Sequence, residues 1–431
     1  MTTSAHTRPS FGRFVIFLGI AVAATIPAIA LRFGGWRPDP LLDALLFGMA
    51  ILAAGFMLSW GAEAAEKRIS QGLIVAVIAL ITVLPEYAVD FYYAYVAGQN
   101  PGSSYVHYAA ANMTGANRLL VGLAWPLLMF IHWLRTRQRE IVLAPVNAAE
   151  IIFLLIGSAW SFTILLRDEI GLLDTIVLIT IFGAYLWRVG QLPKAEEDED
   201  EDDEPGPAAA LGALSLQRQW LIMGALTVIA AAVILVSAEP FAEAMVASGR
   251  RFGFDEFLLI QWLAPLASEA PAVTIAILFV LSGRAASGLT TMISDKINQW
   301  TLLVGMLPLA MSLGAGGLTA LPLDGRQHEE FFLTAAQSLF GIALLLRLRL
   351  HLWGAFALAV LFLAQVGLAL RFLGNVPATI ETLTWLAWAY LALATTLFAV
   401  NFKFLGDLLR MALLSRHPTP QQPAKHGRNE A

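Results

Sequence analysis

The sequence Thr82-Val83-Leu84-Pro85-Glu86 lies within a long apolar stretch and places a carboxyl group in its middle. Ionisable side chains inside the hydrocarbon region of a membrane are costly, so they almost always face the interior of a helix bundle and have a partner there. Glu86 is therefore predicted to meet a cation, a proton or a charged side chain. The next apolar stretch carries further polar groups, at Asn112 and Asn117.

The same arrangement of polar groups occurs twice in the chain. An offset of 183 residues carries Glu86 onto Glu269. It also carries Asn112 onto Asp295, and a Leu-Leu-Val-Gly run that begins at Leu119 onto an identical run. Internal repeats are typical of secondary transporters, in which the substrate site lies at the interface between the repeats. The repeated acid therefore predicts a site that two halves of the chain share.

The composition places the chain in a bilayer. Hydrophobic residues make up 58% of the 431 residues, and the mean hydropathy is +0.68, far above the range of soluble proteins. The alternation that is typical of a β-barrel is absent. Since the chain has no cysteine, disulfides, thiolate metal sites and cysteine nucleophiles are excluded. The expected partners are the lipid bilayer and inorganic cations, with no nucleic acid and no cofactor; the oligomeric state stays open.

We expect an all-α polytopic membrane protein of about twelve spans, because many stretches reach the length that a helix needs to cross the hydrocarbon core. The spans are predicted near residues 13–32, 40–60, 70–97, 104–132, 149–166, 171–190, 217–246, 254–283, 289–317, 330–348, 351–371 and 380–406. The span with Glu86 is the third and the span with Glu269 is the eighth. The two copies therefore cross in opposite directions, as inverted repeats do.

The distribution of basic residues predicts the orientation. With the N-terminus inside, 17 of the 27 Lys and Arg residues fall on the inner side, 7 on the outer side and 3 within spans. Basic residues favour the cytoplasmic side, so both termini are predicted to be cytoplasmic, in a bacterial-type inner membrane. Nine consecutive acids, Glu196 to Glu204, lie in the linker 191–216 and predict a solvated, disordered hinge. A regulatory Ca²⁺ patch is the sharper alternative for these acids.

The repeated stretch offers the oxygen ligands that hard cations prefer. Pro85 is expected to kink its helix and to free carbonyl groups near Val83 and Thr82. In the second copy, Pro265 and Pro271 flank the acid and are expected to open the helix on both sides of it. The candidate ligands of a cation are the carboxyl groups of Glu86, Glu269 and Asp295, the side-chain amide of Asn112 and the backbone carbonyl of Thr82.

An alternative interpretation makes Glu86 and Glu269 structural, in buried salt bridges with Arg118 and Lys296. Lys296 directly follows Asp295, and neighbouring residues of a helix point about 100° apart, so it need not enter the same site.

Three further acids are candidates for proton or entry sites. Asp90 lies one helical turn beyond Glu86 and shares its face, with an ion pair to Arg118 as the alternative. Glu63 and Glu239 are expected at the ends of the spans that precede the repeats, where interfacial solvation is the simpler explanation.

These residues resemble the sodium/calcium exchanger family, a group of cation/calcium antiporters. Its two repeats each carry a Gly-Thr-Ser-x-Pro-Glu run and a Gly-Asn-x-x-Gly-Ser-Asn run. The segments 82–86 and 111–117 are similar to these runs, and Pro265 to Glu269 with Asp295 occupy the equivalent places in the second repeat. Val83 and Leu266 replace serines that family members use toward Na⁺. Trp300 stands where a second asparagine is expected.

The resemblance implies two inverted five-helix repeats with an extra helix at each end. Glu86 and Glu269 would bind the metal by alternating access, and Asn112 and Asp295 would complete the ion sites. The expected regions are an N-terminal tail with an extra span (1–38), a first membrane region (39–190, repeat about 70–132), the linker (191–216), a second membrane region (217–371, repeat about 254–317), and an extra span with a disordered tail (372–431).

The functional prediction is a secondary active antiporter that exchanges Ca²⁺ or another cation for H⁺ or Na⁺. Loss of the serines and the presence of Lys296 favour proton coupling, since a carboxyl group in apolar surroundings readily keeps its proton. The alternatives are a Na⁺/H⁺ or Na⁺/Ca²⁺ exchanger, and a protein of this fold that binds ions or a partner without transport. An integral-membrane enzyme is not expected, because the seven histidines are scattered and form no catalytic cluster with acids.

Overall fold

The computed structural model describes residues 11–36, 39–66, 83–192, 210–211, 214–253 and 255–414, without the side chains of residues 62–66 and 414. Thr82, most of the acidic linker and the C-terminal tail lie outside the described residues. The helices are α1 (Phe11–Gly34), α2 (Pro40–Glu66), α4 (Leu84–Gln99), α5 (Tyr105–Leu119), η1 (Leu120–Ala124), α6 (Trp125–Thr136), η2 (Pro145–Asn147), α7 (Ala148–Leu165), α8 (Leu172–Val189), α9 (Leu216–Phe252), α10 (Glu256–Leu281), α11 (Ala285–Asn298), η5 (Gln299–Leu303), α12 (Val304–Ala315), α13 (Gly325–Leu345), α14 (Leu352–Arg371), α15 (Val376–Val400) and α16 (Phe402–Leu414).

The helices follow the predicted spans in order, in two halves of like plan. The first half runs through α2, α4, the composite helix α5–η1–α6, α7 and α8, and the second through α9, α10, α11–η5–α12, α13 and α14. The third helix of each half contains a π-helical turn, η1 or η5, just after its polar residues. Such turns are rare and occur often at functional sites.

Two small pairs of strands confirm that the halves are inverted. Strand β1 (Glu140–Val142), between α6 and α7, pairs antiparallel with β4 (Arg349–His351), between α13 and α14. Strand β2 (Glu169–Ile170), between α7 and α8, pairs with β3 (Leu321–Pro322), between α12 and α13. Each pair joins the loop after the third helix of one half to the loop after the fourth helix of the other. These loops meet only if the halves cross in opposite directions.

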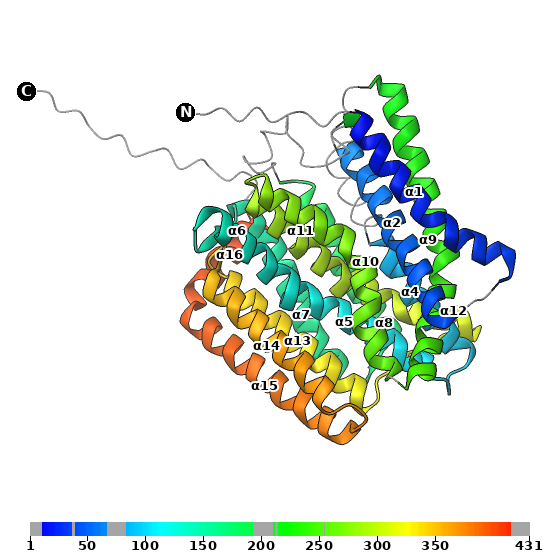
Figure 1. Ribbon diagram of the computed structural model, residues 1–431. Coiled ribbons are helices and arrows are strands. Elements are labelled where there is room, and N and C mark those ends of the chain that lie inside the picture. The colour runs from blue at the N-terminus through cyan, green and yellow to red at the C-terminus, as the bar shows by residue number, and fades with distance from the viewer. Residues whose placement is uncertain are drawn as a thin grey trace, which may run out of the picture.

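The central helices α4, α5, α10 and α12 pack between two outer groups. Helices α1, α2 and α9 run side by side on one flank, and α13, α14 and α15 pack together on the opposite flank (Figure 1). Helix α4 packs on α12 and on α5, and α5 packs on α10. The polar residues of the repeats are therefore surrounded by helices of both halves.

Hydropathy alone identifies only part of this bundle. In the described part of the chain, nine helical segments are long and apolar enough to span a membrane. Helices α4, α11 and α13 are not among them, because they are short or carry buried charged residues such as Glu86, Lys296 and Glu330. The chain is an integral membrane protein, and the helix that carries Glu86, α4, is too short and polar to be recognised as a span by hydropathy.

The final span ends earlier than the sequence predicts. Helix α15 stops at Val400, whereas the prediction placed the end of the span at residue 406. The Asn401 side chain donates a hydrogen bond to the Leu397 carbonyl at 3.0 Å and accepts one from Arg347 Nε at 2.8 Å. Asn401 thus ends the helix, and α16 begins separately at Phe402.

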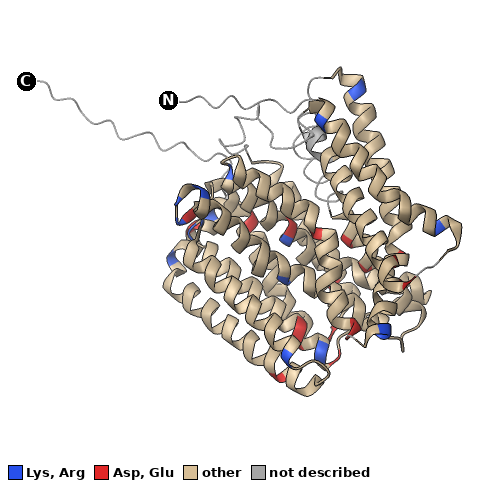
Figure 2. Cartoon of the chain, viewed as in Figure 1, with Lys and Arg blue, Asp and Glu red and all other residues tan. Residues whose placement is uncertain are grey.

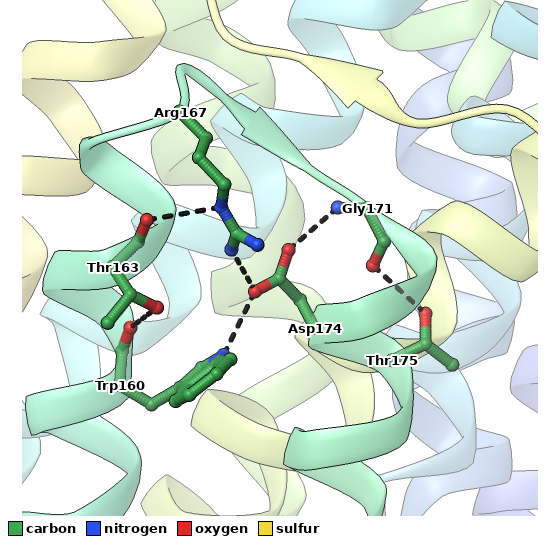
Figure 3. A network of polar contacts seen from close by, with 6 residues as sticks. All are labelled: Trp160, Thr163, Arg167, Gly171, Asp174 and Thr175. Carbon is green, nitrogen blue, oxygen red and sulfur yellow. Dashed lines mark hydrogen bonds and ion pairs between the residues drawn. The ribbon is translucent and has the colours of Figure 1, made fainter.

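The sharp turn between α7 and α8 is held by one buried carboxyl group (Figure 3). Asp174 accepts hydrogen bonds from Trp160 Nε1 at 2.9 Å and from the Gly171 backbone N–H at 2.8 Å. It also forms an ion pair with Arg167, whose Nε donates to the Thr163 carbonyl at 3.2 Å. Because Asp174 lies in the first turn of α8, it also satisfies the positive end of that helix.

Glycines allow the central helices to approach one another closely. A Cβ atom at Gly98 of α4 would lie 2.0 Å from the Met311 carbonyl oxygen of α12, and one at Gly314 of α12 would lie 1.9 Å from the Tyr95 carbonyl oxygen of α4. No side chain fits at either position unless the helices separate. Small residues are the usual means of close helix packing in membranes.

We expect the Gly314→Ala substitution to destabilise the protein by about 1–3 kcal/mol, because the new methyl group overpacks the contact between α4 and α12. Thermal unfolding of the protein in detergent would measure this loss. Gly183→Ala in α8 is the matched control, since a Cβ atom there meets nothing within 4 Å. Equal melting temperatures for the two variants would contradict the close helix contact.

Candidate functional site

Glu86 lies in the first turn of α4 and is 1% exposed. Pro85 stands at the start of this helix, where a missing backbone N–H costs nothing. The expectation that Pro85 frees the Val83 carbonyl is wrong, because Tyr87 N–H donates to that oxygen at 3.1 Å. A proline removes the hydrogen-bond donor of the carbonyl four residues earlier. For Pro85 that carbonyl belongs to residue 81, which lies outside the described residues. The positive end of α4 favours a carboxylate at Glu86.

Glu269 lies in the middle of α10, is 3% exposed, and is flanked by Pro265 and Pro271. The expectation that these prolines open the helix is wrong, since α10 is continuous from Glu256 to Leu281. The reason lies in the neighbouring helix. Pro265 leaves the Gln261 carbonyl without its helical donor, and this oxygen lies directly against Gly115 of α5. Close backbone packing thus covers the free carbonyl, and the helix stays intact.

The central feature of the site is the meeting of the two repeated acids. The buried side chains of Glu86 and Glu269, one from each half, contact each other directly. Asp90 and Asp295 are buried near enough to act electrostatically on Glu86. Two negative charges in contact inside a protein repel each other strongly, so the pair requires a proton or a cation.

Amide side chains hold the acids in place. Asn112 Nδ2 donates to Asp90 Oδ1 at 2.8 Å, and Gln299 Nε2 donates to Glu269 Oε1 at 2.6 Å. These contacts come from the third helix of each half and reach the acidic helix of the same half. They orient one oxygen of each carboxyl group and leave the others available.

Several buried oxygens of the site have no hydrogen-bond donor among the described residues. They are both carboxyl oxygens of Glu86, Oδ2 of Asp90, Oδ1 of Asn112, Oδ2 of Asp295 and Oε1 of Gln299. Buried acceptors are almost always satisfied in native proteins, so such a cluster indicates a missing positive partner. Carboxylate and amide oxygens are the ligands that Ca²⁺ prefers.

In the part of the chain that the structure describes, no three His, Cys, Asp or Glu side chains are grouped so that they could hold one metal ion. The direct contact involves two carboxyl groups, Glu86 and Glu269. A Ca²⁺ ion takes 6–8 oxygen ligands, typically including carbonyls and water. A cation here would therefore need amide or carbonyl oxygens in addition to the pair.

The salt-bridge alternative for the two glutamates is wrong. Arg118 forms its ion pair with Glu330 of α13, and its guanidinium group lies 5.5 Å from the centre of the Trp262 ring. Lys296 Nζ donates to Asn117 Oδ1 at 2.7 Å. The alternative that pairs Asp90 with Arg118 is wrong for the same reason. Arg118 has an ion-pair partner and Lys296 a hydrogen-bond partner elsewhere, so neither forms a salt bridge with the acidic pair.

The remaining candidates lie apart from this centre or outside the described residues. Glu239 pairs with Arg32 of α1 at 2.5 Å and is partly exposed. It does not end a span as predicted, because α9 continues to Phe252. The side chain of Glu63 lies outside the described residues, as does Thr82.

Sequence reasoning missed Gln299 and Glu330, which hold Glu269 and Arg118. Gln299 lies thirty residues beyond Glu269, and the repeat gives no hint of it, because the offset carries it onto Ala116. Glu330 was only weakly indicated by the sequence, since it is an acidic residue at the start of a predicted span. A further hydrogen bond between the halves, from Tyr87 OH to Asn298 Oδ1 at 2.6 Å, was also missed.

The chain matches the family described as sodium/calcium exchanger protein over residues 41–190 and 223–371. Among solved structures, the H⁺/Ca²⁺ exchanger CAX is 36% identical and superimposes with a TM-score of 0.87, covering 94% of this chain and 98% of its own. No curated protein matches the chain.

Structures of the sodium–calcium exchanger NCX_Mj share the fold at much lower identity. One is 15% identical with a TM-score of 0.53, over 76% of this chain and 99% of its own. Another is 16% identical with a TM-score of 0.51, over 76% of this chain and 97% of its own.

We expect Glu330→Met to lower the free energy of unfolding by about 3–5 kcal/mol, because it leaves the Arg118 guanidinium group buried without its carboxylate. The double variant Arg118→Met, Glu330→Met should be more stable than either single variant, since no charge is then left unpaired. Denaturant unfolding in detergent would measure the cycle.

The exposed pair Arg349–Glu140 provides the control, with an N–O distance of 2.9 Å. Arg349→Met should cost less than about 1 kcal/mol. Additive losses in the Arg118 and Glu330 double variant would contradict a buried pair.

Proposed function

Because the chain belongs to the sodium/calcium exchanger family, we propose that it is a secondary active antiporter that exchanges Ca²⁺ for protons across a membrane. The observation that carries this proposal is the direct contact of the Glu86 and Glu269 carboxyl groups, one from each inverted half. The similarity to the H⁺/Ca²⁺ exchanger CAX over 94% of the chain supports the choice of ions.

Coupling follows from the electrostatics of the pair. The two carboxylates bind Ca²⁺ when both are ionised, and they bind protons when Ca²⁺ leaves, because the pair cannot stay doubly charged in an apolar interior. Ca²⁺ and protons thus exclude each other from the same oxygens. An exchanger needs this exclusion so that one ion leaves only when the other replaces it.

The proposed direct ligands of Ca²⁺ are Glu86 and Glu269. Asn112 and Asp295, each with a buried oxygen that has no donor among the described residues, are proposed to complete the ion sites, with Asp295 outside the direct pair. Thr82 is proposed to add its backbone carbonyl, from the resemblance to the family run. We assign Asp90 a proton site, because it is buried beside Glu86 and its Oδ2 has no donor from the described residues. Entry roles are proposed for Glu63 and Glu239, outside the central pair. The transported ions are substrates, and we propose no further cofactor and no enzymatic activity.

Na⁺/Ca²⁺ exchange and Na⁺/H⁺ exchange are less favoured than Ca²⁺/H⁺ exchange, because Val83 and Leu266 lack the side-chain hydroxyl groups that would bind Na⁺. Val83 is buried beside Glu86 and offers no oxygen from its side chain. Leu266 is 45% exposed on α10 and turns away from the interior. Both positions carry serine in the family run that the sequence resembles.

We propose that the strand pair β1–β4 faces the cytoplasm of a bacterial cell and that both termini lie on that side. Basic residues gather at the ends of α6 and α13 beside this pair (Figure 2). They include Arg135, Arg137, Arg139, Arg347 and Arg349. Such residues favour the cytoplasmic side of a membrane.

Vesicles that are acidic inside and free of Na⁺ should take up Ca²⁺ when they contain the protein. Glu86→Gln and Glu269→Gln should each reduce uptake to the level of empty vesicles, because a neutral amide cannot exchange a proton for a cation. Radioactive or fluorescent Ca²⁺ measurements would give the rates.

Glu381→Gln is the matched control, since Glu381 is exposed on α15. Its uptake should equal that of the unchanged protein. Uptake that requires Na⁺ would contradict proton coupling, and uptake that survives both glutamine substitutions would contradict the assigned site. Failure to bind any cation would favour a protein of this fold without transport activity.

The absence of cysteine allows the orientation to be tested with single cysteines. In intact cells, a membrane-impermeant maleimide should label the Leu318→Cys variant but not the Gln138→Cys variant, because these exposed positions lie at opposite ends of the bundle. Gln138→Cys should react only after the cells are permeabilised. The reverse pattern would contradict the proposed sidedness.

A further inference from the structure

Lys296 of α11 places its amino group inside the site, and its side chain is 0% exposed. The groups around its ammonium attract cations. Nζ lies 2.7 Å from Asn117 Oδ1 and 3.4 Å from the Asn117 carbonyl oxygen. It also lies 4.4 Å from the centre of the Trp300 ring, a distance at which an aromatic face attracts a cation. The carboxyl group of Glu86 attracts it electrostatically.

The two residues that contact Lys296 Nζ, Asn117 and Trp300, are related by the internal repeat. The offset of 183 that carries Glu86 onto Glu269 also carries Asn117 onto Trp300. The amino group therefore lies between Asn117 and Trp300, which are equivalent positions of the inverted halves, as Glu86 and Glu269 also are. Two equivalent positions that both face one point form a natural place for an ion at the repeat interface.

A cation of the right size would find the same ligands there if Lys296 were shorter. The amide and carbonyl oxygens of Asn117 are hard ligands of the kind that Na⁺ accepts, and the ring of Trp300 would cover one side. Arg118 lies near enough to act on Lys296 electrostatically, but its charge is paired with Glu330. The nearby acid that attracts Lys296 is thus Glu86, one member of the acidic pair.

We propose that the ammonium of Lys296 is a tethered monovalent cation that occupies the place of a transported Na⁺ ion, so that Lys296 is the residue that excludes Na⁺ from this exchanger. This inference rests on the proposed function, because it assigns the selectivity of that same site. The amino group of Lys296 fills the space between Asn117 and Trp300 and makes the contacts that a Na⁺ ion would need there, so Na⁺ has no space to bind.

The test uses the purified protein in detergent, with NaCl compared with choline chloride at equal ionic strength. The unchanged protein should show the same melting temperature in both salts. Lys296→Ala removes the charge and opens the space, and it should gain a saturable stabilisation by Na⁺. Lys296→Met removes the charge but fills the space, and it should show no stabilisation by Na⁺.

Transport gives the second readout. In Lys296→Ala, Na⁺ should raise the Ca²⁺ concentration for half-maximal uptake about tenfold, since the two cations now compete for Glu86. Lys403→Met is the matched control, because Lys403 is exposed on α16. It should leave uptake insensitive to Na⁺.

Two results would overturn the inference. One is stabilisation of the unchanged protein by Na⁺, which requires no variant and so does not depend on the folding of Lys296→Ala. The other is a folded Lys296→Ala protein that responds equally to Na⁺ and choline. A protein without any Ca²⁺ transport would instead refute the proposed function, and the melting experiment would still report on Na⁺ binding.

Discussion

The structure depends on the contact of two carboxyl groups, Glu86 and Glu269, in the interior of a membrane protein. An isolated pair of this kind would be unstable, because burying unpaired charge costs more than a domain can offset. Under the proposed function, a transported proton or cation balances the pair. The fold therefore places an acidic pair that needs a positive charge between its two inverted halves, an arrangement that suits ion transport.

Neither basic side chain near the centre forms a salt bridge with the two glutamates. Arg118 is held by Glu330, and Lys296 by Asn117, although both lie close to the centre. Gly115 lets α5 approach α10 so closely that it covers the carbonyl that Pro265 leaves free. These contacts fix the polar groups without neutralising the two glutamates. The inverted halves, joined through β1–β4 and β2–β3, bring one acid from each side of the chain to the same point.

Much of this organisation could be predicted from the sequence, because a repeat with a constant offset implies symmetry whatever the local details. The offset of 183 predicted two related halves, the number of spans between Glu86 and Glu269 predicted that the halves are inverted, and the structure confirms both. Local geometry was less accessible. A proline inside an apolar run predicts a kink, but Pro85 begins a helix and α10 remains continuous through Pro265, since these outcomes depend on neighbouring helices. Partner choice was also hidden, because Glu330 is far from Arg118 in the sequence and has no repeated counterpart that would mark it.

The central claim is that Ca²⁺ and protons compete for the same two carboxyl groups. The most direct measurement is a calorimetric Ca²⁺ titration of the purified protein in two buffers of different protonation enthalpy, which yields the number of protons released on binding. The account predicts that Ca²⁺ releases protons from the unchanged protein and that the release is lost, together with binding, in Glu86→Gln and Glu269→Gln. Ca²⁺ binding without proton release, or with a release that both substitutions leave intact, would contradict it.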